Sequence, residues 1–152
     1  PGTRSPAGRP LLTGLTPARL EAWAQRRGLR LLRRPGSPDL AFQRPGHPTQ
    51  LVRWIPRPER SLCTLALQAS FEVPPPAMPR FHQALADANG AIIVGAWVLE
   101  PTGQVFFRMA VPTRGIAYDD DALDQLVDLL VQVVDGQGPA LLQVASGVPM
   151  AT

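Results

Sequence analysis

The sequence predicts a single α+β domain, with three helices and an antiparallel β-sheet in the order α-ββββ-α-ββ-α. Three observations lead to this fold class. The chain has 152 residues, which is about the size of one domain. Short apolar segments are separated by turns rich in Pro and Gly, a spacing typical of antiparallel meanders and too short for parallel crossovers. Three further segments carry apolar residues at helical spacing.

The folded domain is expected over residues 15–145. Residues 1–14 are rich in Pro, Gly, Arg, Ser and Thr and lack apolar periodicity, so they predict a flexible N-terminal tail. Residues 146–152 are expected to form a flexible C-terminal tail. The sequence shows no internal repeat, which favours one domain over a repeat array.

The first helix is predicted over residues 17–27. Thr16 can serve as its N-cap, and Pro17 suits the first helical position because the N–H of that position has no helical partner. Apolar residues then recur at helical spacing up to Gly28, which is expected to end the helix.

The second and third helices are predicted over residues 79–88 and 121–134. Asn89-Gly90 is expected to form a left-handed C-cap of the second helix. The acidic residues 119–121 suit the start of the third helix, where they satisfy free N–H groups and the positive end of the dipole. Residues 136–139, which contain two glycines and a proline, are expected to end it.

Six strands are predicted, over residues 29–33, 40–43, 51–55, 62–73, 92–99 and 104–111. In the longest of them one face is apolar at a two-residue period, so this face is expected to be buried. Pro101-Thr102-Gly103 predicts a hairpin turn between the last two strands. The triple proline at 74–76 predicts a stiff, extended connector.

We expect no catalytic residues, no metal site and no cofactor. The single cysteine, Cys63, alternates with apolar residues along a predicted strand and is interpreted as a core residue. With only His47 and His82 beside it, one subunit has too few nitrogen and sulfur ligands for a structural zinc site. The absence of lysine also excludes Schiff-base and P-loop lysines. The chain is therefore expected not to be an enzyme.

The charge is divided unevenly along the chain. All fifteen basic side chains are arginines; twelve of them lie in residues 1–60 beside three acids, a net charge of +9, whereas residues 61–152 hold three arginines and nine acids, a net charge of −6. Such asymmetry points to an acidic partner or to self-association.

Arginine pairs with phosphate, and arginine or tryptophan can stack on unpaired bases. The candidate residues for binding a nucleic acid or another anionic partner are Arg26, Arg27, Arg30, Arg33, Arg34, Arg53, Trp54, Arg57 and Arg60. The alternative is a solvated arginine face with the tryptophans in the core.

The third predicted helix has a wider apolar face than one sheet needs. Outside its stripe of Asp and Gln residues it consists of Ala, Leu and Val. Part of this face is expected either to pack against a second subunit or to be buried within one chain. The candidate residues for a dimer or client contact are Trp97, Phe106, Val127 and Val131.

The C-terminal half resembles a known family. The pattern consists of Phe81-x3-Leu85-x3-Asn89, then Val98-Leu99, Gly103, Val105, Arg108 and Pro112, then Asp121-x-Leu123-x2-Leu126-Val127-x-Leu129. It is similar to the YbjN-like family over about residues 78–135, and over 16–73 the likeness is one of topology. The resemblance implies a fold like that of the type III secretion chaperones, a homodimer and no enzymatic activity. It also implies a link to stress responses or regulation.

Two functions are consistent with these expectations. The first is a non-enzymatic, chaperone-like adaptor in a stress-response or regulatory pathway, which binds a protein client through apolar patches and sheet edges. The alternative is a DNA-binding accessory protein, related to stress or DNA repair, that uses the arginine-rich N-terminal half. No membrane contact is expected, because the longest apolar run is too short to span a bilayer. A single cysteine fits a reducing compartment, so the expected location is the cytoplasm.

Overall fold

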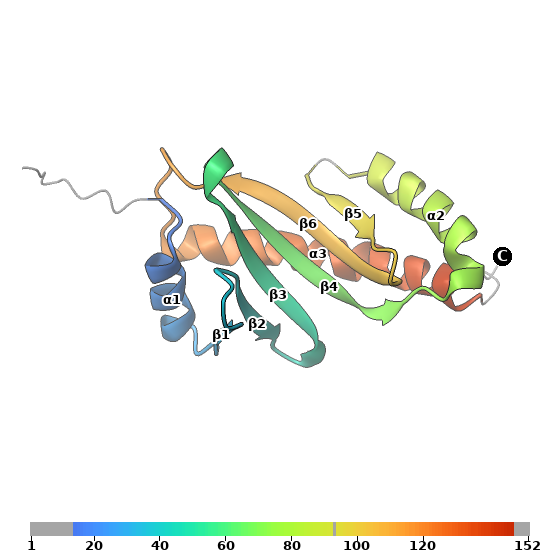
Figure 1. Ribbon diagram of the computed structural model, residues 1–152, viewed down its shortest axis with the longest axis horizontal. Helices are drawn as coiled ribbons and strands as arrows, with labels where there is room; N and C mark the ends of the chain where they lie inside the picture. The colour runs from blue at the N-terminus through green and yellow to red at the C-terminus, as the bar shows by residue number, and fades with distance from the viewer. Residues whose placement is uncertain (1–13, 93, 148–152) are drawn as a thin grey trace, which may run out of the picture.

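The computed structural model describes residues 14–92 and 94–147. Of the tails predicted at 1–14 and 146–152, residues 1–13 and 148–152 lie outside this part, whereas Ser146 belongs to a helix. A six-stranded antiparallel sheet forms one layer and three helices form the other (Figure 1). The helices are α1 (Pro17–Arg26), α2 (Met78–Gly90) and α3 (Asp120–Ser146). The strands are β1 (Leu32–Arg33), β2 (Leu40–Arg44), β3 (His47–Arg57), β4 (Leu62–Glu72), β5 (Ala96–Leu99) and β6 (Gln104–Pro112). Two short 3-10 helices are η2 (Pro58–Arg60) and η3 (Pro75–Ala77).

The strands follow the order β1-β2-β3-β4-β6-β5 across the sheet, and each neighbouring pair is antiparallel. The predicted fold class and element order are therefore confirmed. Because β6 returns to pair with β4, the shorter β5 lies at one edge of the sheet and the two-residue β1 lies at the other.

Helix α1 forms where its local sequence predicts it. The Thr16 hydroxyl accepts a hydrogen bond from the Arg19 N–H at 3.1 Å, and Pro17 occupies the first turn. The helix ends before Gly28, whose φ of 71° is the left-handed conformation that glycine adopts without strain. The predicted caps at both ends are confirmed.

Helix α3 is much longer than predicted. The Asp119 carboxylate accepts from the Ala122 N–H at 2.8 Å, so the acidic start is confirmed with Asp119 as the N-cap. The prediction that residues 136–139 end the helix is wrong, because α3 continues through Pro139 to Ser146. Burial of an apolar stripe that includes Gly138 and Leu141 outweighs the poor helix propensity of glycine and proline.

Four smaller predictions also need correction. Only residues 32–33 of the predicted strand 29–33 pair with β2. Strand β5 starts at Ala96 and not at residue 92, because Gly95 has a φ of 79°, which is not an extended conformation. The Gly95 backbone also lies close to β6, since a Cβ on this residue would stand 2.5 Å from the Arg108 carbonyl oxygen. Asn89 and Gly90 belong to α2 and do not form a left-handed cap. Residues 75–77 form η3 where the sequence predicts an extended connector.

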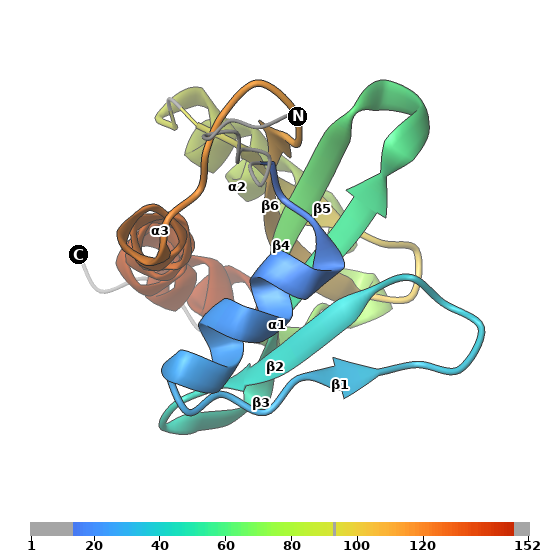
Figure 2. The same ribbon diagram turned by 90° about the vertical axis from the view of Figure 1, so that its left-hand side faces the viewer.

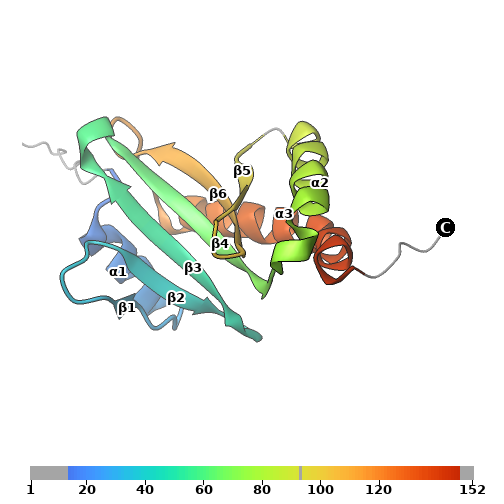
Figure 3. The same cartoon turned by 45° about the vertical axis from the view of Figure 1, so that its right-hand side comes forward.

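All three helices pack on the same face of the sheet, and the opposite face is left uncovered (Figure 2). On the helical side, α1 inserts Trp23 between Phe42 and Trp54, with ring centroids 5.7 and 5.8 Å apart. Helix α2 crosses the C-terminal half of α3 (Figure 3). Gln137 of α3 joins these elements, because it accepts from the Trp97 indole N–H at 2.6 Å and donates to the Ala88 carbonyl at 3.3 Å.

Candidate functional site

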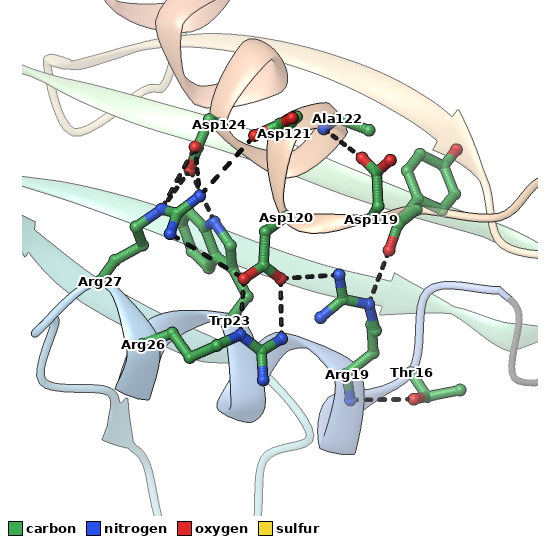
Figure 4. A network of polar contacts seen from close by, with 11 residues as sticks. Thr16, Arg19, Trp23, Arg26, Arg27, Asp119, Asp120, Asp121, Ala122 and Asp124 are labelled. Atoms are coloured by element: carbon green, nitrogen blue, oxygen red, sulfur yellow. Dashed lines mark hydrogen bonds and ion pairs between the residues drawn. The ribbon is translucent and has the colours of Figure 1, made fainter.

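The arginines of α1 point at the acidic N-terminus of α3 (Figure 4). Arg26 donates to both oxygens of Asp120, at 2.6 and 2.8 Å, and Arg19 donates to the same carboxylate at 2.8 Å. Arg27 pairs with Asp124 at 2.7 Å, and the Trp23 indole N–H donates to that carboxylate at 2.8 Å. The network therefore joins the first and last helices of the chain.

This network changes the protonation equilibria of its acids. Hydrogen bonds from Arg26 and Arg19 hold the pKa of Asp120 well below its ordinary value. The pKa of Asp124 is lowered by its hydrogen bonds from Arg27 and Trp23. Both groups are therefore anionic partners for arginine over the whole physiological pH range.

Other candidate arginines are also paired within the chain. Arg33 forms an ion pair with Glu21 of α1, and Arg53 lies 3.3 Å from Asp39. Trp54 has only 1% of its surface exposed, so its ring is buried in the core and is not available to stack on a base. The remaining nominated residues are exposed and make no ion pair with the residues that the structure describes. They are Arg30, Arg34, Arg57 and Arg60.

Much of the charge asymmetry seen in the sequence is thus compensated within the molecule, because basic side chains of the N-terminal half form ion pairs with acids of the C-terminal half. Arg44 adds a further case, because it pairs with Asp135 of α3 through two hydrogen bonds of 2.6 and 2.9 Å. N-terminal arginines thus pair with Asp120, Asp124 and Asp135 of α3, and the hydrogen bond from Arg44 lowers the pKa of Asp135. Four of the nominated arginines, Arg26, Arg27, Arg33 and Arg53, consequently have acidic partners within the chain.

The uncovered face of the sheet brings together a different set of residues. On β3, Arg53 and Ile55 alternate with the buried Val52 and Trp54, as expected for a strand with one side in the core. We call this uncovered side of β3, β4, β5 and β6 the open face. Its residues around the centre are Leu51, Arg53, Ile55, Arg57, Thr64, Ala66, Gln68, Val98, Phe106 and Arg108.

The register places two arginines in one row across the open face. Arg53 lies opposite Ala66 on β4, and Ala66 lies opposite Arg108 on β6. Since neighbouring strands are about 4.8 Å apart, the two arginine Cα atoms are separated by about 10 Å, with a small alanine between them. A shallow hollow of about 130 Å³ lies over this row, and Arg57 and Glu100 also line it.

Apolar side chains border this row on both sides. Ile55 lies on β3 next to Arg53, and Phe106 lies opposite Gln68 and Val98. Within the described part of the chain Arg108 has no ion-pair partner, and its side chain is exposed. The open face therefore combines the guanidinium groups of Arg57 and Arg108, which have no ion-pair partner among the described residues, with apolar surface.

The four residues predicted for a dimer or client contact do not share one surface. Phe106 is on the open face and half-buried, whereas Trp97 is 97% buried on the helical side. Val127 and Val131 are partly buried against the core on α3. The sequence could not separate these positions, because strand alternation does not reveal which face the helices cover.

Groups with nucleophilic or metal-binding chemistry are dispersed. Burial raises the pKa of the Cys63 thiol to about 12, so it is a poor nucleophile at neutral pH. His47 and His82 are exposed and belong to different elements, β3 and α2. Across residues 14–92 and 94–147, His, Cys, Asp and Glu form no cluster of three that could hold a metal ion. In the same residues, none of the helices has the length and apolar character to cross a membrane.

The fold and its open face define a small α+β domain with an exposed sheet surface. The chain belongs to the YbjN family, whose description is "Putative bacterial sensory transduction regulator" and whose model matches residues 16–143. The resemblance seen in the sequence is therefore confirmed for the family. Its expected likeness to secretion chaperones stays a prediction.

Two solved structures have a similar fold. The crystal structure of YbjN from E. coli, there called "a putative transcription regulator", superposes with a TM-score of 0.64 at 12% identity and covers 88% of this chain and 94% of that one. An uncharacterized protein from Methanothermobacter thermautotrophicus gives a TM-score of 0.60 at 11% identity, covering 86% and 99%. No curated protein sequence matches the chain significantly. At these identities the two structures show the fold alone.

Proposed function

We propose that this chain is a non-enzymatic regulatory protein that binds an acidic segment of another protein on the open face of its sheet. The observation that carries the proposal is the row Arg53–Ala66–Arg108 with apolar side chains on both sides of it. Carboxylates of a partner can pair with the guanidinium groups of Arg57 and Arg108, while its apolar side chains pack on Ile55 and Phe106. The family description, a regulator of sensory transduction, supports the regulatory part of the proposal.

A protein segment fits the open face better than a nucleic acid does. Double-stranded DNA carries one charge per about 1.7 Å, so it favours a continuous stripe of cations. Here the arginines are separated by apolar residues, and the acids Glu100 and Asp39 lie at the border of the face. A segment that alternates acidic and apolar residues matches this spacing.

The edge of the sheet at β5 is a weaker candidate for the contact than its face. Asn89 accepts from the Trp97 N–H at 2.7 Å and donates to the Trp97 carbonyl at 3.2 Å. These are the outward-facing groups that an added strand would use, and they are already satisfied. The proposed partner is therefore bound by side chains of the open face and not by strand addition at β5.

The proposal can be tested with a fluorescently labelled peptide of alternating glutamate and leucine. Fluorescence anisotropy should show saturable binding to the full chain, and a matched peptide of lysine and leucine should bind at least about tenfold more weakly. Replacement of Arg57 or Arg108 by glutamate should weaken binding by a similar factor. The matched control is Arg34→Glu, which reverses an exposed arginine outside the open face and should change the affinity less than about twofold.

The same anisotropy experiment also tests the alternative function, DNA binding. A labelled DNA duplex should bind weakly to the chain, and Arg108→Glu should affect this binding no more than Arg34→Glu does. Preference for the duplex over the acidic peptide, or an equal loss of peptide affinity in Arg34→Glu and Arg108→Glu, would contradict the proposal.

The chaperone-like client binding and the homodimer implied by the family resemblance are part of the same proposal. Partly buried Val127 and Val131 on α3 are the residues through which we expect a second subunit to pack. Sedimentation velocity over a range of concentrations tests the dimer. A monomer at all concentrations, or a dimer that is insensitive to Val127→Asp, would contradict this contact.

A further inference from the structure

The two longest strands of the sheet separate at one end. The last pair between β3 and β4 is Val52 with Leu67, although β3 begins five residues earlier at His47 and β4 continues to Glu72. Figure 1 shows the strands diverging, with α3 passing behind the gap. Side chains from all three elements surround a second hollow of about 370 Å³, a size that accommodates a small ligand. We call it the strand–helix hollow, and it is lined by His47, Gln50, Ala69, Ser70, Phe71, Val134, Asp135, Gly138, Pro139 and Leu142.

One polar side chain that lines the strand–helix hollow, Gln50, belongs to a buried residue. Gln50 is 94% buried, and its side-chain oxygen accepts from Arg44 at 2.8 Å. Since arginine only donates hydrogen bonds, the other terminal atom of Gln50 is its NH₂ group. No residue in the described part of the chain accepts a hydrogen bond from this group. A donor at the wall of a hollow can hydrogen-bond to an acceptor on a bound molecule.

Helix α3 carries unfavourable residues at the wall of the hollow. Glycine and proline are the two least favourable residues inside a helix, yet Gly138 and Pro139 occur together there. Packing does not require this glycine, because a Cβ at Gly138 would meet no atom within 4 Å. The glycine instead keeps the wall open. A residue with poor helix propensity inside a helix, where packing does not require it, is a feature of functional positions.

Taken together, the geometry points to a binding site for a small, neutral amphipathic molecule with an acyl chain and a carbonyl head, such as an acyl amide or ester. The acyl chain would lie along the apolar floor formed by Phe71, Val134 and Leu142. The carbonyl oxygen would accept from the Gln50 NH₂ group. A neutral head is favoured because Asp135, the acid at the rim, is already paired with Arg44. None of the residues that line this hollow belongs to the open face, so the inference is independent of the proposed function.

The test uses octanamide as the probe and the ¹⁵N-labelled full chain as the receptor. An NMR titration should give saturable shifts confined to residues 47–50, 69–71 and 134–142. Gly138→Leu fills the hollow and should weaken binding at least about tenfold. Gly136→Leu is the matched control, since it adds the same side chain two residues away, at an exposed position that does not line the hollow, and should change the affinity less than about twofold.

The hydrogen bond from Gln50 is tested separately with toluene, an apolar probe that lacks a carbonyl. Gln50→Leu should weaken octanamide binding by about three- to tenfold, the usual effect of one lost hydrogen bond, and should leave toluene binding unchanged or stronger. Absence of saturable shifts at the hollow would overturn the inference. Equal weakening of octanamide binding by Gly136→Leu and Gly138→Leu would also overturn it.

Discussion

Replacement of Asn89 by alanine is expected to destabilise the fold at the free edge of the sheet. The Asn89 side chain makes two hydrogen bonds with the backbone of Trp97, at 2.7 and 3.2 Å. Trp97 is itself 97% buried, so a water molecule has limited access to these backbone groups once the asparagine is removed. The loss therefore leaves one donor and one acceptor of an edge strand poorly satisfied.

The size of the effect follows from these two bonds. Each contributes about 0.5–1.5 kcal/mol net, so their loss costs about 1–3 kcal/mol. Alanine has a better helix propensity than asparagine, and this difference stabilises α2 by roughly 0.5 kcal/mol. The free energy of unfolding should therefore fall by about 0.5–2.5 kcal/mol.

Urea denaturation followed by circular dichroism measures this change, with the slope m unchanged. Gln83→Ala on the same helix is the control, because Gln83 is exposed and donates to Asp87 at 3.2 Å one turn along the same helix. This variant should change the stability by less than about 0.5 kcal/mol. An Asn89→Ala variant as stable as the natural chain would refute the assignment of Asn89 as the residue that closes this edge.

Three further predictions concern the network, the core and the cysteine. The pKa of Asp120 is lowered in the folded state, so its ion pairs stabilise the fold above the unfolded pKa of about 4. This stabilisation is lost as the pH falls below that value. In urea titrations, Asp120→Asn should therefore lose less stability than the natural chain between about pH 6 and about pH 3. Leu130→Ala should cost about 2–5 kcal/mol, whereas Leu129→Ala next to it, at a 37% exposed position, should cost less than about 1 kcal/mol, and a larger effect at Leu129 would contradict the packing of α3. The buried Cys63 should react with a thiol reagent only in denaturant, and rapid reaction of the native chain at neutral pH would contradict its burial.

The sequence predicted those elements whose signals are local. Thr16, Pro17 and Gly28 specify the ends of α1 through contacts with their own neighbours in the chain, and each behaves as expected. The alternation in β4 likewise identified a buried face that includes Cys63 and Leu65. Such features do not depend on where distant elements pack.

The errors occurred where distant contacts decide the structure. Gly136, Gly138 and Pro139 are local signals for the end of a helix, but burial of the following turns against the sheet and α2 keeps α3 helical. Asn89 was interpreted as a cap, although its partner is Trp97, eight residues further along the chain. Tertiary contacts therefore override local propensity at both places.

The candidate sites were only partly visible in the sequence. The division of charge was correctly recognised, but the partners of Arg26 and Arg27 are acids about a hundred residues away in the same chain. Arg108, which shares a row with Arg53 on the open face, was not nominated for binding because it lies outside the arginine-rich half. Strand periodicity predicts that two faces exist, and only the placement of the helices shows which one is open.

The central claim, that the open face is the binding surface, is tested most directly by mapping a bound partner. The measurement is an NMR titration of the ¹⁵N-labelled chain with the peptide of alternating glutamate and leucine. The account predicts that the largest shifts fall on residues 51–57, 64–68, 96–100 and 106–110, and that Arg108→Glu requires about tenfold more peptide to reach them. Shifts centred instead on the exposed surface of α1 or α3, with the open face unperturbed, would contradict it.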